Sequence, residues 1–148
     1  MVHELGHLAA GLSVGFLFLS LTWGKLVLCR VGDRLHLRWL RGADLLGGLC
    51  VCVPPDTRRL RSRYVVFIAG GPTASLLLAG AAGLALFTGA VGPGFPATVA
   101  LTLLAASLVV FVSGLVPYRR QGVPSDAARL VQVLRGGAEA ERFCALGL

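Results

Sequence analysis

The sequence predicts a membrane protein that is mainly α-helical and contains one small antiparallel β region. Charged residues make up only 14% of the 148 residues, against roughly 25% in an ordinary soluble domain. The mean hydropathy is +0.78. Two segments long enough to cross a bilayer carry no charge. A chain of this length predicts one domain, 1–148, and its composition suits a lipid bilayer better than water.

The first predicted element is a helix at 1–14, which carries the motif HELGH. On a helix, positions i and i+4 lie on one face, so His3 and His7 can both aim an imidazole nitrogen at one Zn²⁺. Glu4 lies beside them and can accept a proton from water that the metal activates. Catalytic zinc takes three protein ligands, so the motif predicts a third ligand elsewhere in the chain.

Residues 15–55 are predicted to form a small antiparallel sheet at the cytoplasmic face of the membrane. The segment KLVLCRVGDRLHLRWLRG alternates apolar and polar residues around a VGD turn, and LLGGLCVCVPP ends at a double proline. Cys50 and Cys52 share a strand face. These two residues, like Cys29 and Cys144, are expected to be buried, reduced thiols. In GFLFLSLTWG, alternation places four side chains on one side: Phe16, Phe18, Ser20 and Thr22.

Two transmembrane helices are predicted, at 64–88 and 95–117. Both segments are uncharged, and at about 1.5 Å per residue the first would span roughly 36 Å. A buried helical hairpin in a soluble protein is the alternative, but neither segment has a polar face. The two spans are joined by the short Gly/Pro connection TGAVGPG, which also lacks charge.

The basic residues lie outside the spans, between Lys25 and Arg63 and again after Pro117. Under the positive-inside rule this distribution places the β region and the C-terminus in the cytoplasm and the Gly/Pro loop outside. No basic face interleaved with aromatic residues is present, so the net charge of +7 does not predict nucleic-acid binding. We therefore expect a multi-pass integral membrane protein that contacts the lipid bilayer.

A short amphipathic helix at 125–135 is predicted after the second span, with Ser125 as its N-cap. Asp126 begins this helix and is a candidate third metal ligand. Its alternative role is that of a first-turn acid favoured by the helix dipole, and the residues alone leave both open. The other acids of the central region have turn-like neighbours and are expected to form turns: Asp33, Asp44 and Asp56.

The motifs and their order resemble the site-2 protease family of intramembrane zinc metalloproteases. That family has an HExxH helix, a membrane-associated β region, a span opening with Gly-Pro, and a later span followed by a Pro…Asp-Gly motif. The matching segments here are HELGH at 3–7, LGGLCVCVPP at 46–55, AGGPTAS at 69–75 and GLVPYRRQGVPSDAARL at 114–130.

The resemblance implies a Zn²⁺ cofactor, a catalytic residue and a substrate class. The metal would be held by His3, His7 and Asp126, and Glu4 would act as general base. The implied reaction is hydrolysis of a peptide bond within or near the bilayer, in a membrane-anchored protein or peptide, as in regulated intramembrane proteolysis.

The chain departs from the family pattern at two positions that the resemblance marks as substrate-binding. The family commonly has Asn three residues after the Pro of the Gly-Pro motif and three residues before the later Pro. Here these positions are Ser75 and Gly114, which weakens the expected polarisation of the substrate carbonyl. The Asp-Gly pair reads Asp126-Ala127. The family also has a span before HExxH, so a minimal or N-terminally truncated member is expected.

Two other functions fit the same sequence. A membrane relative that binds zinc or a partner peptide without cleaving it would account for the changes at Ser75 and Gly114. An unrelated membrane scaffold or transporter fragment would account for the apolar spans alone. Catalytic turnover distinguishes the protease from the first alternative, and the zinc content of the purified protein distinguishes it from the second.

Overall fold

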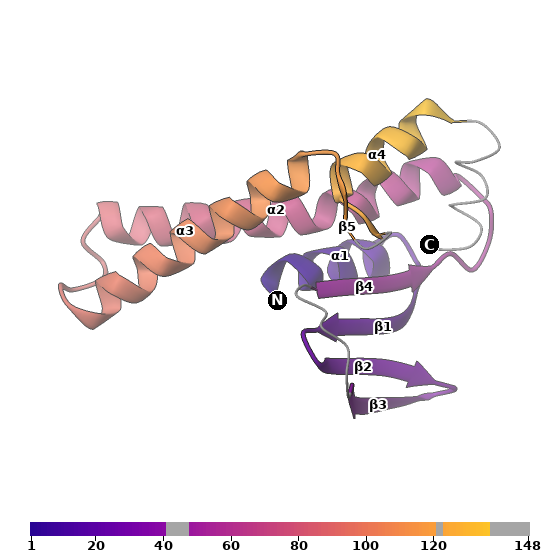
Figure 1. Cartoon of the computed structure of the whole chain (residues 1–148), viewed down its shortest axis with the longest axis horizontal. Helices are drawn as coiled ribbons and strands as arrows, with labels where there is room; N and C mark the ends of the chain where they lie inside the picture. Colours follow the sequence, from indigo (N-terminus) through magenta and orange to yellow (C-terminus); the bar gives the residue numbers. More distant parts are fainter. Residues whose placement is uncertain (41–47, 121–122, 137–148) are drawn as a thin grey trace.

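The computed structural model describes residues 1–40, 48–120 and 123–136, and within them it combines helices with a small antiparallel sheet (Figure 1). This mixture of elements was predicted from the sequence. Asp44 and Cys144 lie outside the described residues. In chain order the elements are α1 (Val2–Ser13), β1 (Leu17–Trp23), β2 (Leu26–Val31), β3 (Arg34–Trp39), β4 (Gly48–Val53), α2 (Leu60–Phe87), α3 (Phe95–Leu115), β5 (Arg119–Arg120), β6 (Val123–Pro124) and α4 (Asp126–Arg135).

The larger sheet has the strand order β3-β2-β1-β4 and is antiparallel throughout. Two tight turns join its first three strands, and each contains a glycine in the left-handed region, Gly24 (φ 57°) and Gly32 (φ 61°). In Figure 1, β4 lies beside α1 and β3 is the far edge of the sheet, where every strand residue is exposed. The sheet therefore meets the helices through its β1 and β4 side.

A bulge in β1 changes the side-chain pattern expected for this strand. Phe18 pairs with Cys52 and Leu21 pairs with Cys50, and the register shifts between Phe18 and Ser20. Because Cys50 and Cys52 are two residues apart and share a face, Phe18 and Leu21 share that face as well. The predicted unbroken alternation is therefore wrong from Ser20 onward, because the extra residue turns the rest of the strand over.

The hydrophobic core lies between the sheet and the first half of α2. Cys50 and Cys52 are buried in it as free thiols, with their Sγ atoms 3.9 Å apart. Cys29 is also a free thiol, but it is only half-buried, because β2 lies farther from the helices, so the expected burial is wrong for this residue. The hydrogen bond with Cys52 and burial raise the pKa of the Cys50 thiol, so this thiol stays protonated at neutral pH. The buried core residues are Phe16, Cys50, Cys52, Tyr64, Phe67, Ile68 and Val133.

Small residues let α1 and α2 approach closely where they cross. A Cβ atom added at Gly6 would overlap the Gly70 carbonyl and the Ala74 methyl. One added at Gly70 would overlap the Gly6 carbonyl and the Ala10 methyl. Both helices thus present a small-xxx-small pair to each other, an arrangement common where membrane helices pack. The close crossing brings the histidines of α1 against the side of α2.

Helices α2 and α3 form a long hairpin that extends beyond the rest of the molecule (Figure 1). Among the described residues, these two helices are long and apolar enough to cross a membrane. Helix α2 begins at Leu60, one turn earlier than the predicted span. Its basic first turn is held by contacts with other elements, since Arg61 donates to the Leu134 carbonyl of α4 and Arg63 donates to the Val14 carbonyl at 2.9 Å.

Helix α3 ends at Leu115, two residues before the end of the predicted span. Val116 has φ −84° and ψ 123°, an extended conformation. The ring of Pro117 clashes with a helical conformation of the residue before it, so the helix must stop here. The chain can then turn back toward α1 through the small β5-β6 hairpin.

Candidate metal centre

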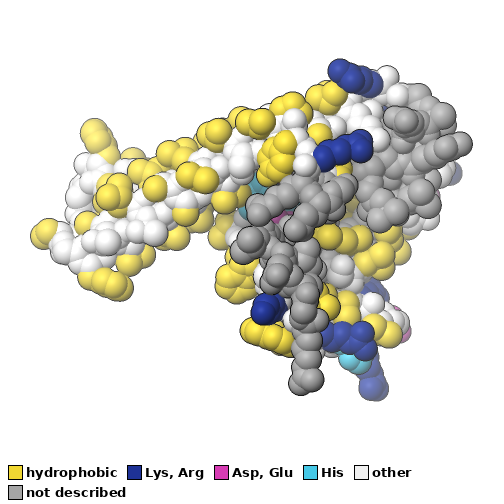
Figure 2. Space-filling view, in the orientation of Figure 1, with side chains coloured by type: hydrophobic (Ala, Val, Ile, Leu, Met, Phe, Trp, Pro, Cys, Tyr) yellow, Lys and Arg dark blue, Asp and Glu magenta, His cyan; other side chains and the backbone are white. Residues whose placement is uncertain are grey.

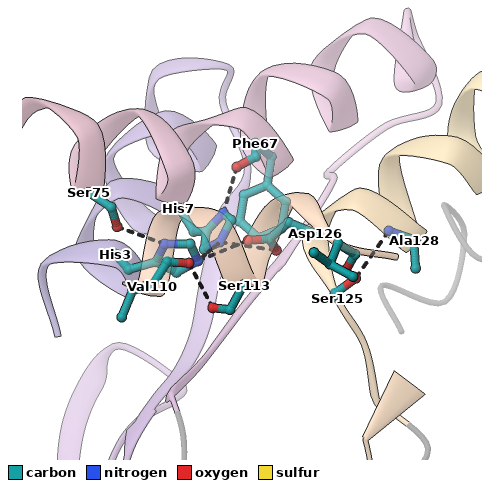
Figure 3. Close-up of polar contacts among 10 residues, drawn as sticks. His3, His7, Phe67, Ser75, Val110, Ser113, Ser125, Asp126 and Ala128 are labelled. Carbon is teal, nitrogen blue, oxygen red and sulfur yellow. Dashed lines mark hydrogen bonds and ion pairs between the residues drawn. The ribbon is translucent and has the colours of Figure 1, made fainter. Parts of the chain in front are cut away.

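His3 and His7 lie one turn apart on α1 and point into the same space, as their spacing predicts (Figure 3). Their Nε2 atoms are 3.2 Å apart and their ring centroids 4.8 Å apart. His7 is 6% exposed, and a side chain of this polarity needs bonded partners when it is buried. The two imidazoles therefore form one polar cluster, in which His7 is buried and His3 is partly buried.

Ser125 fixes the start of α4 close to the end of α3. Its hydroxyl donates to the Val116 carbonyl at 2.7 Å and accepts from the Tyr118 N–H at 3.1 Å. It also accepts from the Ala128 N–H at 3.3 Å, the N-cap bond predicted from the sequence (Figure 3). Because Asp126 is the next residue, these bonds hold its carboxylate at a fixed place beside α1.

The carboxylate of Asp126 completes a group of three metal-binding side chains. Its Oδ2 lies 2.9 Å from His3 Nε2, and its Oδ1 lies 3.3 Å from His7 Nε2. Tetrahedral zinc, with ligand bonds of 2.0–2.2 Å, places neighbouring ligand atoms about 3.3 Å apart. The three side chains therefore lie close enough together to hold one metal ion, with the histidines drawn from the first and the carboxylate from the last of the described helices.

Hydrogen-bond partners at Nδ1 of the two histidines leave their Nε2 atoms free to act as ligands. His7 Nδ1 lies 2.9 Å from the Phe67 carbonyl, which can only accept, so Nδ1 carries the proton and the Nε2 of the neutral ring is an acceptor. His3 Nδ1 lies 3.0 Å from Ser75 Oγ and can donate to it in the same way. Two imidazole acceptors would then face a carboxylate, an arrangement that needs a cation between them. A divalent metal fits this donor set.

In the metal-free protein, a proton is the cation that this group attracts. Burial disfavours charge on His7, but the hydrogen bond and the negative charge of Asp126 outweigh it, and the pKa of His7 is raised. Burial likewise opposes ionisation of Asp126. Where Nε2 of His3 and His7 carries a proton instead of facing a metal, hydrogen bonds from the two rings overcome that penalty and hold the pKa of Asp126 well below its usual range. The carboxylate is therefore ionised and available as a ligand at neutral pH.

Glu4 lies beside the three ligands without joining them. Its side chain rests against the backbone of Gly48 at the start of β4, where an added Cβ would overlap the Glu4 carboxyl group. Its negative charge still reaches His7 and contributes to raising the pKa of that residue. Glu4 therefore lies within electrostatic range of one predicted ligand, and its role as general base stays a prediction.

The two positions marked as substrate-binding have different surroundings. Ser75 is 3% exposed, and its hydroxyl is bonded to His3 rather than directed at open space. Gly114 lies against the metal-binding group, because a Cβ added there would be 3.4 Å from Asp126 Oδ2 and 3.7 Å from the His3 ring. Ser75 thus orients a ligand, and Gly114 leaves room beside two of them.

Two further contributions to the site were not predicted. The Phe67 carbonyl fixes the orientation of His7, and a backbone group has no signature in the sequence. Gly71 makes room for the same imidazole, since an added Cβ would overlap His7 Nε2. Gly71 stands in the AGGP motif, which was taken to mark the opening of a span. The AGGP motif was therefore the one feature of the sequence that could have indicated that Gly71 leaves space for His7.

Two of the remaining acids lie in turns, as predicted. Asp33 pairs with Arg30 at 3.3 Å, and Asp56 pairs with Arg63 at 2.9 Å and accepts the Arg58 N–H.

No family model, curated protein or solved structure matches the chain. The chemistry of the site is therefore inferred from its own residues.

Proposed function

We propose that the chain is an intramembrane zinc metalloprotease, which hydrolyses a peptide bond of a membrane-anchored protein or peptide. The observation that carries the proposal is the meeting of an HExxH pair with a distant carboxylate. His3, His7 and Asp126 offer three ligand atoms to one ion, and Glu4, on the same helix as the histidines, is bonded to none of the three. Three protein ligands with an acid alongside is the composition of catalytic rather than structural zinc sites.

The surface of the α2-α3 hairpin supports a place in the membrane. Only 11% of the most apolar window of α3, and 33% of that of α2, is buried inside the molecule. The core helix of a soluble protein would be mostly buried, whereas apolar side chains cover the projecting hairpin (Figure 2). With basic residues at both outer flanks, we assign the β region and the C-terminus to the cytoplasm and the Gly/Pro loop to the outside.

In the proposed reaction, some residues of the chain orient the metal ligands and another transfers a proton. Zinc, when bound, supplies Lewis acidity that polarises a carbonyl and lets water ionise near neutral pH. The Phe67 carbonyl and Ser75 keep the two imidazoles turned toward the ion. Glu4 takes a proton from the attacking water and delivers it to the amine of the broken peptide bond, which leaves a new carboxylate and a new N-terminus.

Replacing Glu4 with Gln tests this reaction. The amide keeps the size of the side chain but cannot accept the proton, so turnover should fall by about 10²–10⁴-fold. Membrane proteins from cells that express wild type or Glu4→Gln would be compared by sequencing their N-termini. We expect new N-termini inside apolar segments with wild type and with the surface variant Asp33→Asn. The same new N-termini with Glu4→Gln would contradict the proposed mechanism.

A zinc-binding relative without catalytic activity is the second candidate. The observation in its favour is that Ser75 is bonded to His3 and that Gly114 has no side chain. Neither position then presents the side-chain amide that the family uses to polarise a substrate carbonyl. Zinc bound in stoichiometric amount, together with no new N-termini in cells that express wild type, would favour this candidate over the protease.

A further inference from the structure

A second site lies on the side of α4, between this helix and the β5-β6 hairpin. It is a cavity of about 300 Å³, a volume in the range of small ligand pockets. Its polar lining comes from Arg119 of β5 and from Gln132 and Arg135 of α4, and its apolar wall comes from Pro124, Ala128 and Val131. None of these residues belongs to the metal centre.

The lining has an excess of positive charge. Within the described part of the chain, it contains two arginines and no acid, and neither guanidinium takes part in a hydrogen bond or ion pair there. The C-terminal end of α4 contributes about half a negative charge. Arg61 already donates to the Leu134 carbonyl at that end. Two full positive charges therefore dominate, and basic side chains are visible on the surface over α4 (Figure 2).

The chemistry of the lining selects a phosphate group on an apolar carrier. Two guanidinium groups and an amide suit the oxygen atoms of a phosphate. Free inorganic phosphate has no apolar part that could pack against the wall formed by Pro124, Ala128 and Val131. A phospholipid headgroup presents both parts, a charged phosphate and the glycerol ester behind it.

The position of the pocket agrees with such a ligand. Arg119 lies four residues after Leu115, where α3 ends. If α3 spans the bilayer as proposed, this arginine stands at the level of the lipid headgroups on the cytoplasmic side. Basic pockets beside helix ends on that side are the ones that bind anionic headgroups.

We propose that the pocket between α4 and β5-β6 binds the phosphate of an anionic phospholipid headgroup. The inference rests on the membrane placement given above and adds a lipid site that the protease chemistry does not require. Because α4 also carries Asp126, a lipid bound there would contact the helix that supplies the third metal ligand.

The test compares the affinity of the detergent-solubilised full chain for two fluorescent short-chain lipids, phosphatidic acid and phosphatidylcholine, by fluorescence anisotropy. We expect wild type to prefer phosphatidic acid by at least about 10-fold, the size of effect that charge-assisted hydrogen bonds give. Arg119→Gln/Arg135→Gln should remove the preference. Arg34→Gln/Arg38→Gln, on the exposed strand β3, removes the same charge elsewhere and should keep it.

Three outcomes would overturn the proposal. The preference could survive in Arg119→Gln/Arg135→Gln, or it could be lost equally in the β3 variant, which would show a general charge effect. Displacement of the lipid by inorganic phosphate at similar concentrations would assign the site to free phosphate. Recovery of wild type in the soluble fraction of cells is a separate result, which would contradict the membrane placement itself. Unchanged zinc content and melting temperature confirm that the pocket variant is folded.

Discussion

At the scale of single residues, Ser75 changes role between sequence and structure. The resemblance assigns it to the substrate, because the family has a side-chain amide at this position. In the structure its hydroxyl is bonded to His3 Nδ1 at 3.0 Å and is buried. Ser75 therefore orients His3, a candidate metal ligand.

Ser75→Ala should weaken zinc binding by about 10- to 100-fold, the usual effect of removing a partner that orients a metal-binding histidine. The affinity is measured by competition with a chromophoric chelator. Ser107→Ala is the matched control, since Ser107 is also a buried serine and lies about two turns before Gly114 on α3. An equal loss in both variants would mean that the effect comes from packing rather than from the bond to His3.

The dependence of zinc affinity on pH follows from the raised pKa of His7. Metals bind the neutral imidazole, so protons compete with zinc once the pH falls to the pKa of the metal-free protein. Because that pKa lies above the ordinary value of 6.5, the affinity should begin to fall above pH 6.5. At pH values below the pKa of His7, the zinc affinity should fall about tenfold per pH unit for each proton that the metal displaces. Asp126 stays ionised throughout, because its pKa is lowered.

Chelator competition between pH 8 and pH 5.5 measures this dependence. His36→Gln serves as the control, since His36 lies on exposed strand β3 and should not affect the curve. A constant zinc affinity down to pH 6 would contradict the interaction of His7 with Asp126 as described.

The ligands and their environment were not equally accessible from the sequence. His3 and His7 could be predicted because a helix places positions i and i+4 on one face. Asp126 could not be chosen from its neighbours alone, because a first-turn acid has the same local pattern as a ligand. The Phe67 carbonyl could not be foreseen at all, since the backbone group that lies opposite a side chain is set by how two helices pack.

At the scale of elements, the crossing of α1 and α2 sets how closely His7 of the candidate metal centre approaches α2. Gly6 and Gly70 bring the two backbones into contact, and the same approach places His7 within hydrogen-bond distance of the Phe67 carbonyl. The helix boundaries were predicted to within a turn from charge and proline. The crossing point was not, because glycines are frequent in α2 and only the packed structure shows which one is in contact.

Gly70→Ala should separate the two helices and weaken both folding and zinc binding. Overpacking a tight contact costs about 1–3 kcal/mol, so the melting temperature in detergent should fall and the zinc content should drop. Gly80→Ala is the matched control on the same helix, because nothing lies within 4 Å of a Cβ added there. Alanine is the better helix former, so this control should melt no lower than wild type. If Gly70→Ala also melts like wild type with full zinc content, the crossing is not tight.

The bulge in β1 shows a different limit of prediction from sequence. Alternation correctly indicated a strand, and Gly32 correctly marked the turn between β2 and β3. A single extra residue in β1, however, reverses the face of every later side chain. Nothing in the apolar run of that strand shows where the extra residue lies, so the facing of Ser20 was wrong although the strand itself was right.

At the scale of the whole molecule, the metal centre joins the two ends of the described chain. Its histidines come from the first helix and its carboxylate from the last, with the sheet and the long hairpin between them. The tight crossing of α1 and α2 positions one part, and the bonds of Ser125 position the other. The hairpin that extends from this assembly carries the apolar surface assigned to the bilayer (Figure 1).

The zinc content of the purified full chain tests this convergence most directly. Wild type, Asp126→Ala and Asp33→Ala would be prepared without metal-affinity steps and analysed by elemental mass spectrometry. We expect about one zinc per chain in wild type and in Asp33→Ala, and little in Asp126→Ala, because a catalytic site relies on three protein ligands. Full zinc content in Asp126→Ala, or none in wild type, would contradict the assignment of His3, His7 and Asp126 as one metal site.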